Sequence, residues 1–445
     1  MHLYGTQAIT KKNHLSIGGV DTVELVKNYG TPLFVYDIAL FRKRARGFID
    51  TFKNASVKAQ VAYASKAFSS VAIYQVAAQE GLSVDVVSGG ELYTALQAGF
   101  PSEKIHFHGN NKSLHELEFA FESNIGCIVI DNFYEIDVLK QLSTQRKQKM
   151  HVLIRVTPGV EAHTHDFITT GQSDSKFGFD LNNGQADKAF QQLLHHPYLE
   201  LQGMHCHIGS QIFDTAAFRL AAKKLADKMG EWQENYQFHT SVLNLGGGFG
   251  IRYTDEDTPL EPSVYVDDMI KTVKQEAQNL NIPMPEIWIE PGRSLVGDAG
   301  TTLYTIGSQK EVPNVRKYLA VDGGMSDNIR PALYEAKYDA VIANKMTQPA
   351  TETYTIAGKL CESGDKLIEK IHLPEAEPND ILAVFCTGAY GYSMASNYNR
   401  IPRPAVVFVE NGEHQLVVKR ESYEDLVKLD LPLLIGEGQL EREKK

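Results

Sequence analysis

Strand-like and helix-like segments alternate through the first two thirds of the chain, and this alternation limits the possible folds more than any other feature of the sequence. Eight segments have the composition of strands: VKAQVAYA from 57, SVDVVS from 83, KIHFHG from 104, CIVID from 127, HVLIRV from 151, LQGMHCH from 201, VLNLGGG from 242 and EIWIEPG from 286. Stretches between them, such as SSVAIYQVAAQEG and AAFRLAAKKLADKMGEW, have helical spacing, and Gly81 and Gly99 stand where glycines end helices. Eight such units predict a (β/α)8 barrel of the TIM type, although a doubly wound open sheet shows the same alternation.

The alternation stops near residue 300. The segments TTLYTIG, KYLAVDGG, TETYTIAG and ILAVFCTGAYG predict a mainly β domain, in which Asn411-Gly412 marks a hairpin. The early segment TPLFVYD is expected to join the sheet of that domain. We therefore predict an α/β chain in three parts: residues 1–40 as an N-terminal segment of the β domain, 41–299 as a cofactor-binding barrel, and 300–445 as the β domain.

Charge and hydropathy exclude several classes of protein. With 55 acidic and 44 basic residues the net charge is −11, so no basic excess exists for a nucleic-acid surface. The longest apolar run, residues 381–386, is far shorter than the ~20 residues of a membrane helix. The N-terminus lacks the pattern of a secretory signal, and four cysteines at 127, 206, 361 and 386 form no CxxC pair. These features predict a cytoplasmic enzyme with reduced thiols.

The ends of the predicted strands carry the residues that a barrel enzyme would use. They are Lys66, Ser88, His108, Arg155, His207, Gly246 to Gly248, and Glu290 to Arg293. The triple glycine opens the loop of the seventh unit, where backbone N–H groups can bind a phosphate, and EPGR follows on the eighth. A tight turn without a ligand is the alternative. No P-loop motif occurs, so a nucleotide phosphate site of that type is not expected.

Lys66 lies among small and apolar residues at the end of the first strand, where burial would lower the pKa of its amine. A neutral amine can form a Schiff base with an aldehyde, although an isolated lysine after a strand is more often a surface residue. Together with a phosphate loop, Lys66 suggests pyridoxal 5′-phosphate as cofactor. Glu290 would then face the ring nitrogen and keep it protonated; its alternative is a turn ion pair with Arg293.

Histidine pairs leave a metal site open as a rival interpretation. His205 and His207 point to one face of the sixth strand, and His163 and His165 form a second HxH pair. A metal-dependent barrel hydrolase would need further acids or histidines, which are not evident at the other strand ends. We therefore expect no metal, and His207 fits better as an aromatic platform against the cofactor ring.

Several motifs together resemble the diaminopimelate decarboxylases, pyridoxal-phosphate enzymes built on an alanine-racemase-like barrel and a β domain. They run in order from about Pro32 to Glu421: YASKA, RVTPGVEAHTH, SKFGF, HCHIGSQ, LGGGFG, EPGRS, DGGMSDNIRPALYEA, CESGD and GAYGYSMASNYN. The resemblance implies decarboxylation of meso-2,6-diaminopimelate to L-lysine and CO2, the last step of lysine biosynthesis.

The resemblance also implies a role for each matching residue. Lys66 would hold the cofactor and His207 would stack on its ring, while Glu290 would pair with the ring nitrogen. The phosphate would be bound by Ser210, Gly247, Gly248, Gly292 and Arg293, with the Tyr390 hydroxyl. The distal carboxylate of the substrate would be bound by Arg293, Arg330, Tyr334 and Tyr390, and its distal ammonium by Glu362. Cys361 would be the proton donor. In this family Cys361 and Glu362 come from the partner subunit, which implies a homodimer with shared sites.

Residue chemistry supports this substrate independently. Ornithine or lysine presents only a cation at its far end, whereas a substrate with a distal amine and carboxylate needs both a guanidinium and a carboxylate. Arg330 and Glu362 supply these two groups, and two charge-assisted contacts would give discrimination on the order of 100-fold. A related decarboxylase of arginine or ornithine, a racemase, a metal-dependent hydrolase and a non-catalytic cofactor carrier remain as alternatives.

Overall fold

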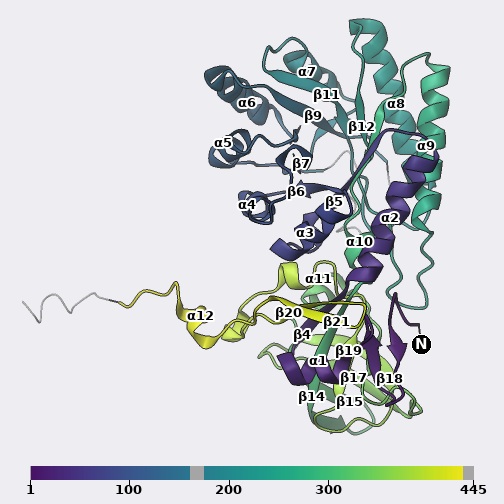
Figure 1. Ribbon diagram of the computed structural model, residues 1–445, viewed down its shortest axis with the longest axis vertical. Helices are drawn as coiled ribbons and strands as arrows, with labels where there is room; N and C mark the ends of the chain where they lie inside the picture. The colour runs from purple at the N-terminus through teal and green to yellow at the C-terminus, as the bar shows by residue number, and fades with distance from the viewer. Residues whose placement is uncertain (1, 161–174, 434–445) are drawn as a thin grey trace, which may run out of the picture.

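The computed structural model describes residues 2–160 and 175–433. Figure 1 shows a barrel surrounded by helices, which lies above a second, strand-rich domain. Both the N-terminal strands and the last strands of the chain lie in the lower domain. Among the described residues, no helix is both long and apolar enough to cross a membrane.

Eight parallel strands close the barrel. They are β5 (Ala59–Ala64), β6 (Ser83–Val86), β7 (Ile105–Phe107), β8 (Cys127–Ile130), β9 (Met150–Thr157), β11 (Leu199–His205), β12 (Val242–Asn244) and β13 (Glu286–Ile289). Because β13 pairs with β5 and β8 pairs with β9, the sheet has no open edge in this ring, and the short β10 (Phe179–Asp180) is added beside β9. The predicted (β/α)8 barrel is confirmed, and the open doubly wound sheet is wrong.

Helices cover the outside of the barrel (Figure 1). They are α2 (Ile38–Asn54), α3 (Val71–Gln79), α4 (Gly89–Gln97), α5 (Leu114–Glu122), α6 (Phe133–Arg146), α7 (Gln185–Leu193), α8 (Ala216–Tyr236) and α9 (Pro262–Asn279). The short α10 (Arg293–Val296) follows β13 and lies at the end of the barrel that faces the second domain. Ser70, Ser88 and Ser113 accept hydrogen bonds from the first turns of α3, α4 and α5, which fixes where each helix begins. Gly81 and Gly99 follow the ends of α3 and α4 with φ of 78° and 70°, as the sequence predicted.

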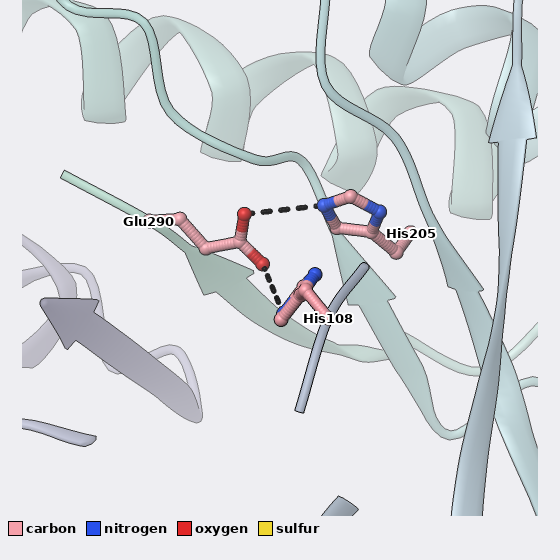
Figure 2. Close-up of side chains that lie close together, drawn as sticks. All are labelled: His108, His205 and Glu290. Carbon is pink, nitrogen blue, oxygen red and sulfur yellow. Dashed lines mark hydrogen bonds and ion pairs between the residues drawn. The ribbon is translucent and has the colours of Figure 1, made fainter. Parts of the chain in front are cut away.

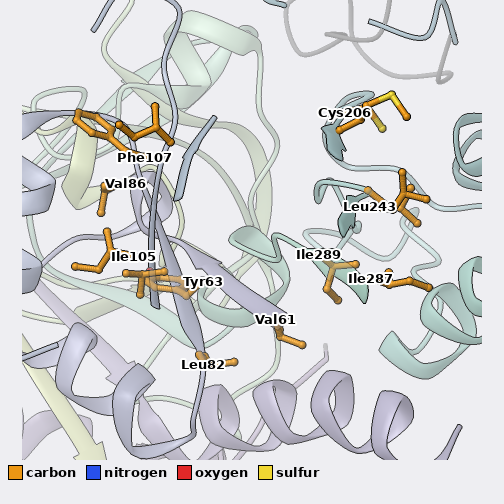
Figure 3. Close-up of a cluster of buried hydrophobic side chains, with 14 of the residues drawn as sticks. Val61, Tyr63, Leu82, Val86, Ile105, Phe107, Cys206, Leu243, Ile287 and Ile289 are labelled. Atoms are coloured by element: carbon orange, nitrogen blue, oxygen red, sulfur yellow. The ribbon is translucent and has the colours of Figure 1, made fainter. Parts of the chain in front are cut away.

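The main hydrophobic core lies between the barrel strands and these helices. Figure 3 shows part of it, with side chains that β5, β6, β7, β12 and β13 contribute. Ile128 and Val152 belong to this core, whereas their neighbours Val129 and Leu153 belong to a separate small cluster. Alternate residues of each strand therefore pack on opposite faces, one toward the helices and one toward the barrel axis.

The second domain is built from a seven-strand path in which an N-terminal strand lies in the middle. β4 (Leu33–Asp37) pairs antiparallel with β14 (Gly300–Val312) and parallel with β20 (Ala405–Glu410), so the expectation that TPLFVYD joins this sheet is confirmed. The path continues through β15 (Arg316–Val321), β17 (Glu352–Ala357) and β18 (Lys366–Leu373) on one side and β21 (Glu413–Val418) on the other. β19 (Ile381–Val384) branches from β14 and pairs on its other side with β16 (Ala340–Ile342).

Smaller elements complete this domain. They are the sheet of β1 (Ala8–Ile9), β2 (Leu15–Ile17) and β3 (Val20–Asp21), and the helices α1 (Thr22–Tyr29), α11 (Arg330–Tyr334) and α12 (Tyr423–Val427). The predicted hairpin at Asn411-Gly412 joins β20 to β21, and both turn residues have positive φ, 54° and 83°. Two positive φ values are what the tight primed turn of a two-residue hairpin requires.

Candidate active site

A cavity of about 220 Å³ lies where the barrel strands end and the second domain begins. Ten residues singled out in the sequence line it together: Lys66, His207, Ser210, Gly248, Glu290, Gly292, Arg293, Arg330, Tyr334 and Tyr390. They come from the first, sixth, seventh and eighth barrel units and from the β domain. The fold therefore gathers residues that lie more than 300 positions apart in the sequence into one site.

Lys66 stands in a single 3-10 turn, Ser65–Ala67, directly after β5. Ser65 donates a hydrogen bond of 2.6 Å to the Asp85 carbonyl, which ties this turn to β6. The Lys66 side chain extends into the open cavity and is exposed there. Although part of this side chain is exposed to the cavity, desolvation by the surrounding protein atoms is the largest influence on the pKa of its amine and lowers it. Electrostatic attraction to Tyr390, Asp85 and Glu290 outweighs this, so the pKa is raised and the expectation of an easily deprotonated amine is wrong.

Glu290 follows β13 and lies at the inner face of the barrel, with three nitrogen atoms around its carboxylate. Asn244 donates to Oε1 at 2.7 Å, His205 Nε2 lies 3.1 Å from Oε2, and His108 Nε2 lies 3.2 Å from Oε1. Figure 2 shows the two histidines converging on the carboxylate from separate strands. Burial would raise the pKa of Glu290, but the two histidines outweigh it and hold the pKa well below its ordinary value.

This arrangement corrects two sequence-based interpretations. Glu290 does not form the turn ion pair that was its alternative, since the Arg293 guanidinium instead donates to the Ser210 and Tyr253 hydroxyls. The view that no other strand end could complete a metal shell is also wrong. Ligand atoms of His108, His205 and Glu290 lie within 4.8 Å of one another, as a metal-binding set would.

The glycine turn after β12 packs too tightly for any side chain. A Cβ at Gly247 would lie 2.0 Å from the Glu290 carbonyl oxygen, and one at Gly248 would lie 2.2 Å from the Gly209 carbonyl oxygen. Gly248 also has a φ of 106°, which favours glycine. The Gly246 and Gly247 N–H groups donate within the protein, to Asn244 and His207, whereas Gly248 and Ser210 face the cavity. Gly248 and the Ser210 hydroxyl therefore form a small cradle suited to an anion.

His207 adjoins this cradle. It lines the cavity with its ring, and its Nδ1 accepts a hydrogen bond of 3.3 Å from the Gly247 N–H. Burial lowers the pKa of His207 well below its ordinary value, so the ring is neutral at pH 7. A neutral aromatic ring at this position can pack against a planar ligand.

Arg330 is held rigidly at the side of the cavity that the β domain forms. Its Nε donates to the Tyr338 hydroxyl at 2.9 Å. Its guanidinium also lies over the rings of Tyr253, Tyr334 and Tyr390, at 5.8, 5.6 and 5.7 Å from their centroids. Since these contacts engage only Nε and the planar faces, the outer N–H groups can bind a carboxylate.

Three predicted site residues do not line the cavity: Gly247, which lies in the turn beside it, and Cys361 and Glu362. Cys361 and Glu362 lie on one loop of the second domain. Both are exposed, on the loop between β17 and β18, and the Cys361 N–H donates to Asn399 at 2.8 Å. His163 and His165 lie outside the described residues, so their role stays a question for experiment.

Asn244, Tyr253 and Tyr338 contact Glu290, Arg293 and Arg330, respectively, and the sequence analysis missed all three. Asn244 carried a signal, because it lies two positions before the triple glycine and so shares the inward face of its strand. Tyr253 and Tyr338 carried none, since each acts on an arginine brought near by folding.

Comparison with known proteins gives a consistent result. Residues 39–297 match the family model described as pyridoxal-dependent decarboxylase, pyridoxal binding domain. Diaminopimelate decarboxylase of Bacillus subtilis (strain 168) is 65% identical over 439 residues, 99% of this chain and 100% of that protein. The corresponding enzyme of Staphylococcus aureus (strain COL) is 46% identical over 425 residues, 95% of this chain and 99% of that protein. The crystal structure of diaminopimelate decarboxylase from M. jannaschii in co-complex with L-lysine is similar with a TM-score of 0.90 and 36% identity, covering 96% of this chain and 98% of that one.

Proposed function

The chain belongs to the pyridoxal-dependent diaminopimelate decarboxylases, and from this premise we propose how its residues divide the work of the reaction. The reaction is the pyridoxal-phosphate-dependent decarboxylation of meso-2,6-diaminopimelate to L-lysine and CO2, the last step of lysine biosynthesis. The observation that best supports this function is that one cavity is lined by the amine of Lys66, the ionised carboxylate of Glu290 and the glycine turn at Gly248.

These three groups fit pyridoxal phosphate. Lys66, which lines the cavity, would bind the aldehyde carbon of the cofactor through Nζ. Ser210, Gly247, Gly248, Gly292, Arg293 and Tyr390 would bind its phosphate, and His207 would pack on its ring. Glu290 would accept the ring N–H, as an anion placed beside a pyridinium does. When bound, the cofactor supplies an electron sink for the electrons that remain when CO2 departs.

The substrate end of the site is assigned to the β domain. Arg330, with Arg293, Tyr334 and Tyr390, would bind the distal carboxylate, and Arg330 is already held in place by Tyr338. The partner subunit's Glu362 would bind the distal ammonium. A substrate that lacks the distal carboxylate would leave the Arg330 charge unpaired, which disfavours ornithine and lysine on the order of 100-fold.

We assign the final proton transfer to Cys361 of a second copy of the chain. Its thiol would donate a proton to the substrate carbon that has lost CO2. Support for this shared site is the position of Cys361 and Glu362, which are exposed and lie away from the cavity of their own chain. The site is therefore complete only in a homodimer. A cytoplasmic location is part of the same proposal, supported by four free cysteines.

Substrate preference and lysine labelling test this proposal. We expect CO2 release from meso-diaminopimelate to exceed release from ornithine, lysine or arginine by about 100-fold or more in kcat/KM. Borohydride reduction of the holoenzyme should label Lys66. The variant Lys66→Ala should lose the label and the absorbance of the bound cofactor, whereas Lys58→Ala, near the start of the same strand, should keep both. Equal activity on ornithine, or labelling of another lysine, would contradict the assignment.

A further inference from the structure

Three barrel strands end in residues that meet in one buried cluster beneath the cavity. His108 follows β7, His205 is the last residue of β11, and Glu290 follows β13 (Figure 2). All three point to the barrel axis, where they are only 4%, 1% and 6% exposed. Of the three, only Glu290 lines the cavity, so the histidines can act on a bound molecule only through that carboxylate.

A carboxylate in such a position is protonated unless donors hold its charge, because burial disfavours the ionised form. Glu290 has one neutral amide donor, Asn244, on Oε1. Its other oxygen, Oε2, is bonded to His205 Nε2 at 3.1 Å, while His108 Nε2 stands 3.2 Å from Oε1.

The protonation state of His205 follows from its surroundings. Burial lowers its pKa, and its second ring nitrogen, Nδ1, has no hydrogen-bond partner, so the ring is neutral and its Nε2 carries the proton donated to Glu290. The His108 ring lies against that of His205, with centroids 4.8 Å apart at 73°, and its Nε2 is also 3.9 Å from Asp85. The two rings therefore pack against each other, and each also places its Nε2 next to the Glu290 carboxylate.

We propose that His108 and His205 are positioning residues, which hold Glu290 ionised and correctly oriented so that it can keep the ring nitrogen of the cofactor protonated. The inference rests on the proposed role of Glu290. It accounts for two buried histidines that do not line the cavity and whose Nε2 atoms lie 3.2 and 3.1 Å from the same carboxylate.

The test compares the binding of two cofactors to the full-length apoenzyme. One is pyridoxal phosphate, and the other is its analogue in which the ring nitrogen is replaced by C–H. If His205 acts through Glu290, His205→Leu should weaken pyridoxal phosphate binding about tenfold, as expected for the loss of one hydrogen bond to a charged group, and leave binding of the analogue unchanged. His205→Gln, which can still donate an N–H, should restore most of the loss. His108→Gln should show the same selectivity with a smaller effect than His205→Leu.

His106 provides a matched control. It is also buried and faces the barrel interior from β7, but its ring stacks on Trp288 at 4.2 Å and its Nε2 contacts Gln60. His106→Gln should change the affinity for neither cofactor selectively. A merely structural role of His205 would weaken binding of both cofactors equally, and that result would overturn the inference.

Glu290→Gln separates failure of this inference from failure of the proposed function. If Glu290→Gln selectively weakens pyridoxal phosphate binding and His205→Leu does not, the histidine inference alone is wrong. If Glu290→Gln affects both cofactors equally, Glu290 does not face the ring nitrogen, and both statements fall. Because each comparison uses two ligands on one variant, a loss of stability cannot imitate the selective result.

Discussion

Mixing two inactive variants tests the shared site most directly. Lys66→Ala removes the amine from the cavity, and Cys361→Ala removes the thiol from the exposed loop that we assign to the neighbouring site. A homodimer of either variant has two defective sites. In a mixed dimer, both defects fall in one site, and the other site combines an intact amine with an intact thiol.

The expected recovery follows from the symmetry of a dimer. Random exchange of equal amounts of two variants makes half of the dimers mixed, and each mixed dimer has one intact site of two. Activity should therefore rise from near zero to about a quarter of the wild-type rate. The assay is CO2 release from meso-diaminopimelate after subunit exchange, with mixed dimers quantified by two affinity tags.

Two control mixtures should recover nothing. Lys66 and Glu290 line the same cavity of one chain, so Lys66→Ala mixed with Glu290→Gln leaves no intact site. Cys361→Ala mixed with Glu362→Gln also leaves none, because both residues belong to one loop. If mixed dimers of Lys66→Ala and Cys361→Ala form and stay inactive, or if a control mixture recovers activity, the shared site is refuted.

Three further predictions concern single residues. Gly248→Ala should lower the free energy of unfolding, measured by urea titration, by about 1–3 kcal/mol and weaken cofactor binding, because its Cβ would meet the Gly209 oxygen. Gly81→Ala, with open space around its Cβ, should keep cofactor binding, and equal binding losses in the two variants would contradict the prediction. Burial raises the pKa of Asp327 to about 7, so the folded state binds more protons between about pH 4 and 7 and loses stability as pH rises through that window. Asp327→Asn should reduce this loss when the free energy of unfolding is measured between about pH 5 and 7, and an unchanged pH dependence would contradict the prediction. Arg330→Gln should raise KM for meso-diaminopimelate about tenfold or more in steady-state assays, and an unchanged KM would remove Arg330 from the substrate site.

Most of the fold could be predicted from short stretches of sequence. The eight strand segments, the terminating Gly81 and Gly99 and the Asn411-Gly412 turn each depend on a few neighbouring residues, and each appears in the structure where the sequence placed it. Closure of the barrel needed the pairing of β13 with β5, a long-range contact that alternation alone does not distinguish from an open sheet. The domain boundaries at residues 40 and 299 stay a prediction.

Electrostatics in the site were harder to anticipate. Small apolar neighbours of Lys66 suggested a lowered pKa, but Asp85 and Glu290, brought close by other strands, raise it. Likewise, His108 and His205 are separated by 97 positions, and only the closed barrel makes them partners of one carboxylate. Charge interactions depend on the distance between groups in space. The residues at the strand ends therefore identify the titratable groups of the site, but not the direction in which their pKa values shift.

The central place of β4 in its sheet has a consequence for synthesis of the protein. This strand is among the first to leave the ribosome, yet its two partners, β14 and β20, emerge only after the whole barrel has been translated. At elongation rates of about 5–20 residues per second, this apolar strand stays without its partner strands for on the order of tens of seconds. A chaperone that binds extended apolar segments should therefore capture LFVYD on nascent chains arrested inside the barrel, and release it once β20 has been made.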